Sequence, residues 1–387
     1  MTAARKSAAK RGKVRNLGKS QHGDSLRTVL VTARIRKSIL LEIFMEQQTK
    51  KFDLITFGET MLRLSPPSNG RIFRSDIFEK HAGGAELNVA SGVSLLGLRS
   101  GIITRLPRNE LGTFVKNRIR FSSVSDDFII YDDSPDARLG IYYYENGAYP
   151  RKPTVVYDRR HSSITKITLD EIPEDIYGKT RMFYTSGITL ALSENTRVLA
   201  IELIKRFKEA GAEIAFDVNY RANLWDEETA RTTIKQILPF IDVLFISEES
   251  CRRMFQKTGT LEEMHREFCR DFPNIRFIAS SEREVISPKI HSFTSLIYSK
   301  AEDTFYTEEP YKDIDVVDRI GSGDAYCSGV LFGLLKYGDP KKAMEFGNAT
   351  CATKNTIAGD LPLSDFNEIS SIIKGHQTKG KQSEMNR

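Results

Sequence analysis

The segment with the clearest chemical potential is a glycine-rich turn at residues 318–325, Asp-Arg-Ile-Gly-Ser-Gly-Asp-Ala. It lies between an extended β-branched run and an apolar, helix-like run. Gly321 and Gly323 let the backbone approach a ligand closely, and amides at the start of a helix favour negative charge. A carboxylate at Asp324 would repel a bound phosphate, so a site that only holds phosphate does not explain this residue. A base that removes a proton from a hydroxyl does explain it. The turn therefore suits phosphoryl transfer, with Asp324 as base and the preceding amides as an anion hole.

A plain structural role is the alternative for this turn, because short Gly-x-Gly turns before helices are common. No Gly-Lys-Ser/Thr follows the glycines, so the segment is not a P-loop. Its neighbours in the sequence decide between the two interpretations.

A second cluster, residues 81–88, places Gly83 and Gly84 directly before a helix, with Asn88 one turn inside it. Paired glycines remove side chains where a polar ligand approaches the backbone. Asn88 can both donate to and accept from sugar hydroxyls. On its own, this cluster is better explained as a plain glycine turn followed by a solvated asparagine.

A third cluster, Asp-Val-Asn-Tyr-Arg-Ala-Asn-Leu-Trp at 217–225, follows a predicted strand at its carboxyl end, the edge where open α/β sheets bind ligands. Arg221 can bind a carboxylate through two hydrogen bonds. The alternative is an ion pair between Asp217 and Arg221 at the surface. We expect Trp225 to lie in the core in either case.

A fourth group comprises Tyr142, Tyr144 and Arg159. Aromatic hydroxyls and a guanidinium suit a polyhydroxy acid, although each tyrosine alone could simply pack against a neighbour. The three lie in the stretch 137–160, which has an extended pattern without long helices, as does 61–82. We expect these two stretches to form a small sheet that covers the site.

Elsewhere, short apolar runs alternate with helical ones from residue 52 onward. Strands are predicted at 54–57, 101–104, 182–185, 213–216, 243–246 and 276–279, and helices at 85–96, 111–121, 196–210, 227–238 and 325–337. Repeated strand-then-helix order predicts a parallel sheet with helices on both faces.

The composition of the 387-residue chain, 40% apolar and 28% charged, predicts a packed globular core. Its four cysteines lie far apart without a Cys-x-x-Cys pair, which argues against a zinc site or disulfide framework and fits the reducing cytoplasm. No apolar run approaches the roughly 20 residues that span a bilayer, so no membrane is expected.

Charge is uneven along the chain. Residues 1–44 carry eleven Lys or Arg and two Asp or Glu, a net charge of +9, so the total of +6 leaves −3 for the remainder. The basic character belongs to the leader, and we expect no nucleic-acid binding by the main body.

The leader at 1–44 has three interpretations: a transit peptide, a disordered basic tail, or a segment that precedes a natural start at Met45. We favour the last and expect a domain at 45–375, with a polar tail at 376–387 that frays.

Together, over about residues 50–375, these clusters resemble the ribokinase-like sugar kinases of the phosphofructokinase-B type. The resemblance implies an α/β fold, a three-layer sandwich with a mostly parallel central sheet and a small β lid. Segments most similar to the 2-keto-3-deoxygluconate kinases within that family are Gly58-Glu59, 83–88, Arg138-x-Gly140-x-Tyr142, 184–193, 217–225 and 247–249.

The resemblance also implies roles by position. Asp324 corresponds to the catalytic base, and the anion hole to Gly321, Ser322 and Gly323. The implied substrate contacts are Gly83, Gly84, Asn88, Tyr142, Tyr144, Arg159, Arg221 and Asp324. The implied ATP contacts are Ser247, Ser280, Gly321, Gly323 and Asn348. Mg²⁺ is expected with the ATP, without an assigned ligand.

Several positions depart from the family pattern. Ser247-Glu-Glu-Ser250 stands where the family has Asn-x-x-Glu, a motif tied to metal placement, and Tyr144 stands where relatives often have arginine. Ser280-Ser-Glu-Arg283 replaces a Lys-x-Gly, and His161 replaces a small residue. The phosphoryl-transfer centre therefore matches the family better than the adenine pocket does.

The resemblance implies a cytoplasmic, homo-oligomeric kinase that uses ATP and Mg²⁺ to phosphorylate 2-keto-3-deoxy-D-gluconate at its terminal hydroxyl, giving the 6-phosphate. The first alternative is another sugar kinase of the same fold, chiefly a fructokinase, because fructokinases share a similar Asp-x-Asn-x-Arg-x-x-Leu-Trp stretch. The second is a non-catalytic sugar-binding relative, which the altered Asn-x-x-Glu motif leaves open.

Overall fold

The computed structural model describes residues 50–378. The predicted leader at 1–44 lies outside the described residues, as does most of the predicted tail, whose residues 376–378 end the last helix, α11 (Phe366–Thr378). Among the described residues, no helix is long and apolar enough to cross a membrane.

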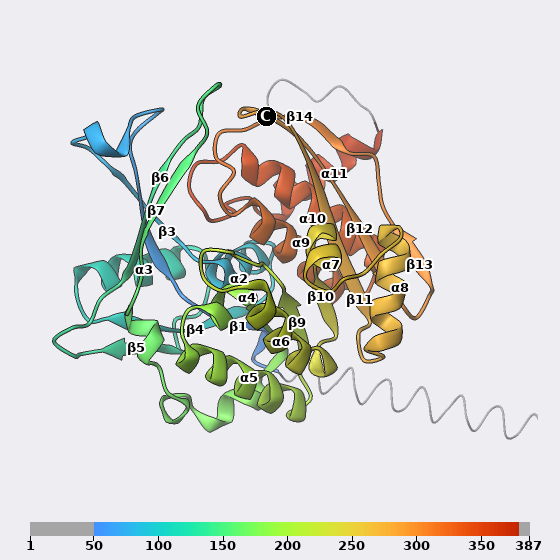
Figure 1. Ribbon diagram of the computed structural model, residues 1–387, viewed down its shortest axis with the longest axis horizontal. Coiled ribbons are helices and arrows are strands. Elements are labelled where there is room, and N and C mark those ends of the chain that lie inside the picture. Colours follow the sequence, from blue (N-terminus) through green and yellow to red (C-terminus); the bar gives the residue numbers. More distant parts are fainter. Residues whose placement is uncertain (1–49, 379–387) are drawn as a thin grey trace, which may run out of the picture. The chain divides into compact units, whose positions relative to one another are not determined.

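A ten-stranded sheet runs through the unit that begins at Lys51, in the order β13-β12-β11-β10-β9-β8-β1-β4-β5, with β14 paired to β12 (Figure 1). The strands from β11 to β5 are parallel, whereas β12, β13 and β14 pair antiparallel. Their bounds are β1 Phe52–Phe57, β4 Ser100–Pro107, β5 Ile129–Asp132, β8 Thr180–Ser186, β9 Glu213–Asp217, β10 Val243–Phe245, β11 Phe277–Ser287, β12 Ile290–Ser299, β13 Thr304–Tyr306 and β14 Tyr311–Asp315. The expected mostly parallel sheet is confirmed.

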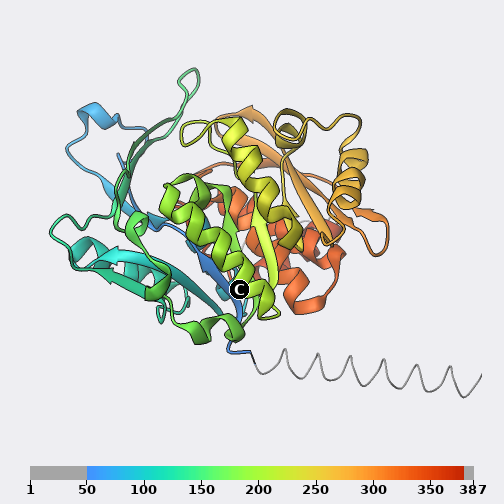
Figure 2. The ribbon, with the colours of Figure 1, turned by 60° about the horizontal axis from the view of Figure 1, so that its bottom comes forward.

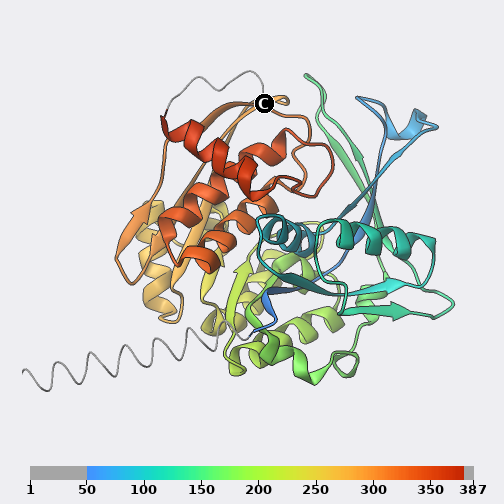
Figure 3. The ribbon, with the colours of Figure 1, turned by 180° about the vertical axis from the view of Figure 1, so that it is seen from behind.

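Helices cover both faces of this sheet, because neighbouring residues of a strand point to opposite sides. In β1, Ile55 packs in a core with α5, α6 and α8, while Leu54 packs in a separate core with α2, α9 and α10. Figure 2 shows the first layer in front of the sheet, and Figure 3 shows α9, α10 and α11 from behind. The helix bounds are α2 Ala85–Leu95, α3 Glu110–Phe121, α4 Gly187–Ala191, α5 Glu194–Glu209, α6 Glu227–Ile237, α7 Glu248–Arg253, α8 Leu261–Asp271, α9 Ser322–Tyr337 and α10 Pro340–Asn355.

A second sheet of four strands forms from the two stretches that lacked long helices, in the order β3-β2-β6-β7. The bounds are β2 Met61–Ser65, β3 Glu79–Gly83, β6 Gly140–Glu145 and β7 Thr154–Asp158. β2 and β6 run parallel, with Arg63 opposite Tyr142. The expected small sheet is therefore confirmed (Figure 1).

Every predicted strand and helix corresponds to an element of the structure, with ends that differ by a few residues. The largest difference is β11, predicted at 276–279 but observed at Phe277–Ser287. Beyond Ser280 this strand is mostly exposed and carries Glu282, Arg283 and Glu284, so its sequence lacks a buried apolar pattern. Trp225, expected in the core, is buried there.

Candidate active site

The glycine-rich turn leads directly into α9, and Gly321 caps the helix with a left-handed φ of 80°. A Cβ at Gly321 would lie 2.0 Å from the carbonyl oxygen of Asp360. Both the backbone angle and the space therefore require glycine here. Gly323 has nothing near its missing side chain, and it is exposed at the first turn of the helix. The helix start is thus open to a ligand at Gly323, as an anion site requires, while the amide of Ser322 donates to the carbonyl oxygen of Arg319 at 3.3 Å.

Asp324 lies in the first turn of α9, behind this exposed backbone. The side-chain amide of Asn88 in α2 donates to its Oδ2 at 2.7 Å. Burial raises the pKa of Asp324 to about 6, while the hydrogen bond from Asn88 and the charge of Arg221 act in the opposite direction. The carboxylate is thus oriented and is a stronger base than an exposed aspartate, which suits proton removal near neutral pH.

Two more carboxyl groups lie near Asp324, those of the buried Glu86 and the partly buried Asp217. Glu86 in α2 accepts hydrogen bonds from the amide and hydroxyl of Ser186 and from the hydroxyl of Thr189. Burial raises the pKa values of Glu86 and Asp217 to about 7 each, and the negative charge of Asp324 adds to both shifts. Three acidic groups with raised pKa values in one place mark a functional centre.

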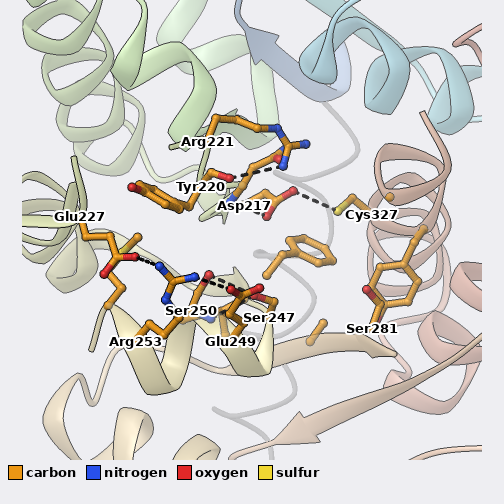
Figure 4. Close-up of a pocket in the computed structure, with 17 residues that line it drawn as sticks. Asp217, Tyr220, Arg221, Glu227, Ser247, Glu249, Ser250, Arg253, Ser281 and Cys327 are labelled. Atoms are coloured by element: carbon orange, nitrogen blue, oxygen red, sulfur yellow. Dashed lines mark hydrogen bonds and ion pairs between the residues drawn. The ribbon is translucent and has the colours of Figure 1, made fainter. Parts of the chain in front are cut away.

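Beside Asp324, a cavity of about 270 Å³ lies over the carboxyl ends of β9 and β10 and the first half of β11, and it reaches Gly323 (Figure 4). It is lined by Asp217 and Arg221 after β9, by Ser247 after β10 and by Ser281 of β11. Ligands bind at this edge of open α/β sheets. The first turns of α9 and these three strands therefore border one shared cavity.

Arg221 is exposed at this cavity, and its Nη1 donates to the carbonyl oxygen of Tyr220 at 3.3 Å. Among residues 50–378 no ion pair joins Arg221 to Asp217, whose carboxylate instead accepts from the amide of Asn219. The positive charge of Arg221 nevertheless opposes the rise in the pKa values of Asp217 and Asp324. Its guanidinium is thus available to an acidic ligand close to the base.

The paired glycines Gly83 and Gly84 lie in close contact with Asp360 and Glu59, respectively. Gly84 has a φ of 146°, and a Cβ there would lie 2.1 Å from the carbonyl oxygen of Glu59. A Cβ at Gly83 would lie 2.0 Å from a carboxylate oxygen of Asp360. Beside them, the Oδ1 of Asn88 is buried without a hydrogen-bond partner. An unpaired buried acceptor is costly, so this atom is suited to a ligand hydroxyl.

The three residues expected to contact substrate from the small sheet are already engaged with protein groups. The hydroxyl of Tyr142 donates to Asp360, and the ring of Tyr144 lies 4.6 Å from the guanidinium carbon of Arg63. Arg159 pairs with Glu59, with its Nε 2.8 Å from Oε2. Among the three, none lines the cavity beside Asp324.

Of the serine and asparagine residues expected to contact ATP, one lines the cavity and two are bonded to other protein groups. Ser247 caps α7 through the amide of Ser250 and lines the cavity. The Ser280 hydroxyl is bonded instead to His265 Nε2 at 2.8 Å, on the buried side of β11, and it is Ser281 that lines the cavity. Asn348, in α10, is fully buried and bonded to Ser295 and Glu308.

Asp360 and Arg63, the centre of a buried ionic cluster, were not predicted from the sequence. Arg63 Nη1 lies 2.7 Å from Asp318 Oδ2 and 3.0 Å from Asp360 Oδ1. The nearby carboxylates raise the pKa of Arg63, against the effect of burial. This cluster joins the small sheet to the glycine turn.

The cavity offers oxygen ligands that suit a divalent metal. Mg²⁺ typically binds one or two protein carboxylates together with the phosphate oxygens of a nucleotide. No group of three or more potential metal ligands is found in the part of the chain that the structure describes. Asp217, Glu227 and Glu249 line the cavity, and Arg253 pairs with both glutamates (Figure 4). These residues fit a metal that arrives with nucleotide phosphates better than a preformed metal cage.

Comparison with known proteins agrees with this geometry. A family model described as pfkB family carbohydrate kinase matches residues 51–360. A 2-dehydro-3-deoxygalactonokinase from Haloferax volcanii is 36% identical over 331 residues, which cover 84% of this chain and 97% of that protein. A 2-dehydro-3-deoxygluconokinase from Bacillus subtilis is 28% identical over 344 residues, covering 85% and 99%. The crystal structure of a 2-dehydro-3-deoxygluconokinase from Thermotoga maritima superposes with a TM-score of 0.79 at 32% identity, covering 84% and 98%.

Proposed function

Because this chain belongs to the pfkB family of carbohydrate kinases, we propose that it transfers the γ-phosphoryl group of ATP to the terminal hydroxyl of a 2-keto-3-deoxy sugar acid. With 2-keto-3-deoxy-D-gluconate the product is the 6-phosphate. The observation that carries the proposal is Asp324, a partly buried carboxylate with a raised pKa at the exposed start of α9.

In the proposed reaction, Asp324 takes the proton of the sugar hydroxyl as its oxygen attacks the γ-phosphorus. The new oxygen–phosphorus bond forms as the bond to ADP breaks, and the amides of residues 321–323 stabilise charge on the transferring group. Mg²⁺ bound with the nucleotide supplies further neutralisation of phosphate charge. Asn88 orients Asp324 through its amide nitrogen and offers its unpaired Oδ1 to the sugar.

Arg221 is the proposed partner of the substrate carboxylate. It is exposed at the cavity, while Arg159, the other candidate, is paired with Glu59. Both arginines were expected to contact the acidic sugar, and we propose Arg221 alone as the partner of its carboxylate. Removing it should lower kcat/KM for the sugar acid by roughly 10- to 100-fold, the value of a charge-assisted hydrogen bond.

The choice of sugar follows from the relatives, which act by name on 2-keto-3-deoxy acids of both the gluco and galacto configuration. We therefore propose this substrate class and test both epimers. Fructose represents the main alternative, a fructokinase, which needs no carboxylate partner.

A panel of these sugars with ATP and Mg²⁺, followed by coupled release of ADP, tests the proposal. Arg221→Ala should reduce turnover of the acids and leave any slow reaction with fructose unchanged. Preference for fructose would refute the acid assignment and keep the kinase assignment. Sugar binding without any ADP release would favour the non-catalytic alternative.

We further propose that the enzyme acts in the cytoplasm, where ATP is abundant, and as a homo-oligomer. The four buried free cysteines are compatible with a reducing compartment. Light scattering coupled to size-exclusion chromatography would give the oligomeric state, and a monomer at micromolar concentration would refute that part.

A further inference from the structure

Lys354, near the end of α10, is among the few fully buried cationic side chains of the described residues, with 1% of its surface exposed. Its ammonium group donates to two backbone carbonyl oxygens, that of Asp318 at 3.1 Å and that of Ile357 at 3.0 Å. Neither the proton transfer nor the substrate contacts use this group. A buried ammonium is costly unless it is paired, so its position calls for a function.

The two carbonyls belong to segments that flank the catalytic centre. Asp318 begins the glycine turn, and Ile357 belongs to the loop that leads from α10 to Asp360. The carbonyl of Asn355 accepts from the amides of Val317 and Asp318, at 2.8 and 3.1 Å. The turn that ends in the anion hole is therefore built on the carboxyl end of α10, and Lys354 lies at that junction.

The junction needs a positive charge for a physical reason. Carbonyl oxygens that converge on one point repel each other, and the carboxyl end of a helix carries partial negative charge. Lys354 neutralises this region, just as Arg63 neutralises the carboxylates of Asp318 and Asp360. Burial lowers the pKa of Lys354, and the charges of Asp318 and Asp360 oppose that shift.

The turn beyond Asp318 has little freedom once its start is held. The Asp318 carboxylate accepts from the amide of Ile320 at 3.1 Å and from that of Gly359 at 3.0 Å. Gly321 then follows, against the carbonyl of Asp360. A shift of the Asp318 carbonyl would therefore be transmitted to the anion hole at residues 321–323.

We propose that Lys354 is a positioning residue whose ammonium acts as a built-in cation, holding the carbonyls of Asp318 and Ile357 and thereby the anion hole. The inference rests on the proposed phosphoryl transfer. It predicts that the protein needs no dissolved monovalent cation at this place, because the side chain supplies one.

Two substitutions separate charge from packing. Lys354→Ala removes the ammonium and leaves space, whereas Lys354→Met removes the charge but fills much of the space with a flexible apolar chain. Both should lower kcat by about 10- to 100-fold, the effect of an active-site displacement of about 1 Å, with a smaller change in KM for the sugar. Lys336→Ala, which changes an exposed lysine of α9, is the matched control and should match the wild type.

Chemical rescue provides the decisive readout. Ammonium or methylammonium chloride should restore part of the kcat of Lys354→Ala and none of that of Lys354→Met, with tetramethylammonium chloride as the ionic-strength control. The inference is overturned if Lys354→Met keeps wild-type kcat, since packing alone would then suffice. It is also overturned if no cation improves the alanine variant.

A measurement on the wild type covers the case in which both variants fail to fold. Replacing all potassium, sodium and ammonium salts by tetramethylammonium should leave its kcat unchanged. A requirement for an added monovalent cation would contradict the built-in cation while the kinase function stands. A wild type without activity on any sugar of the panel would instead refute the proposed function.

Discussion

At the scale of single residues, Asp324 carries the proposed proton transfer. Asp324→Asn keeps the shape and the hydrogen bond to Asn88 within reach but removes the base. We expect turnover to fall about 10²–10⁴-fold, the usual contribution of general-base catalysis, with sugar binding preserved. Single-turnover kinetics and calorimetric sugar binding would measure the two effects. Near wild-type turnover in this variant would refute the mechanism.

The environment of Asp324 makes a prediction about pH. The base must be ionised, and its pKa of about 6 means that kcat/KM should fall as the pH drops through this region. The hydrogen bond from Asn88 favours the ionised form, so Asn88→Ala should raise the pKa and move the acid limb of the profile to higher pH. Wild type and variant share the titration of ATP, so their difference isolates the enzyme group. An unchanged or lowered limb would show that Asn88 does not stabilise the carboxylate.

At the scale of elements, the junction between the glycine turn and α9 offers a matched pair of glycines. Gly321 has a left-handed φ and no room for a side chain, whereas Gly323 has room for one. Gly321→Ala should destabilise the protein by about 1–3 kcal/mol, as backbone strain at such a position costs.

Gly323→Ala should leave stability unchanged or slightly higher, because alanine favours helix by up to ~1 kcal/mol over glycine. Its methyl group faces the cavity, so activity should fall while the fold stays intact. Urea unfolding and nucleotide titration would separate the two variants. Equal stability losses in both would contradict the difference in backbone strain.

At the scale of the whole molecule, the unit from Lys51 contains its own cores, both sheets and the complete candidate site. A chain that begins at Met45 should therefore match the full-length protein in activity and melting temperature. Residues 1–44 lie outside the described residues, so this stays a prediction from charge and pattern. A clear loss of either property would show that the leader contributes to the domain.

Several features of the whole molecule could be predicted from the sequence. The strand–helix alternation and the glycine turn are local features, set by side-chain periodicity and by backbone angles that only glycine adopts easily. They were enough to predict the parallel sheet, the small sheet and the position of Asp324 at a helix start. The family likeness, later confirmed by comparison, depended on the order of such local motifs.

Tertiary structure alone decided which of the remaining candidates face the cavity. Asn88 and Asp324 are 236 residues apart, and Arg63 and Asp360 are 297 apart, so no local pattern predicts their contacts. Ser280 and Ser281 differ by one position, yet a strand turns adjacent side chains to opposite faces, and only the packing of β11 shows which serine is buried. The role of Lys354 could not be predicted from the sequence for the same reason, because its partners are backbone carbonyls that folding brings together.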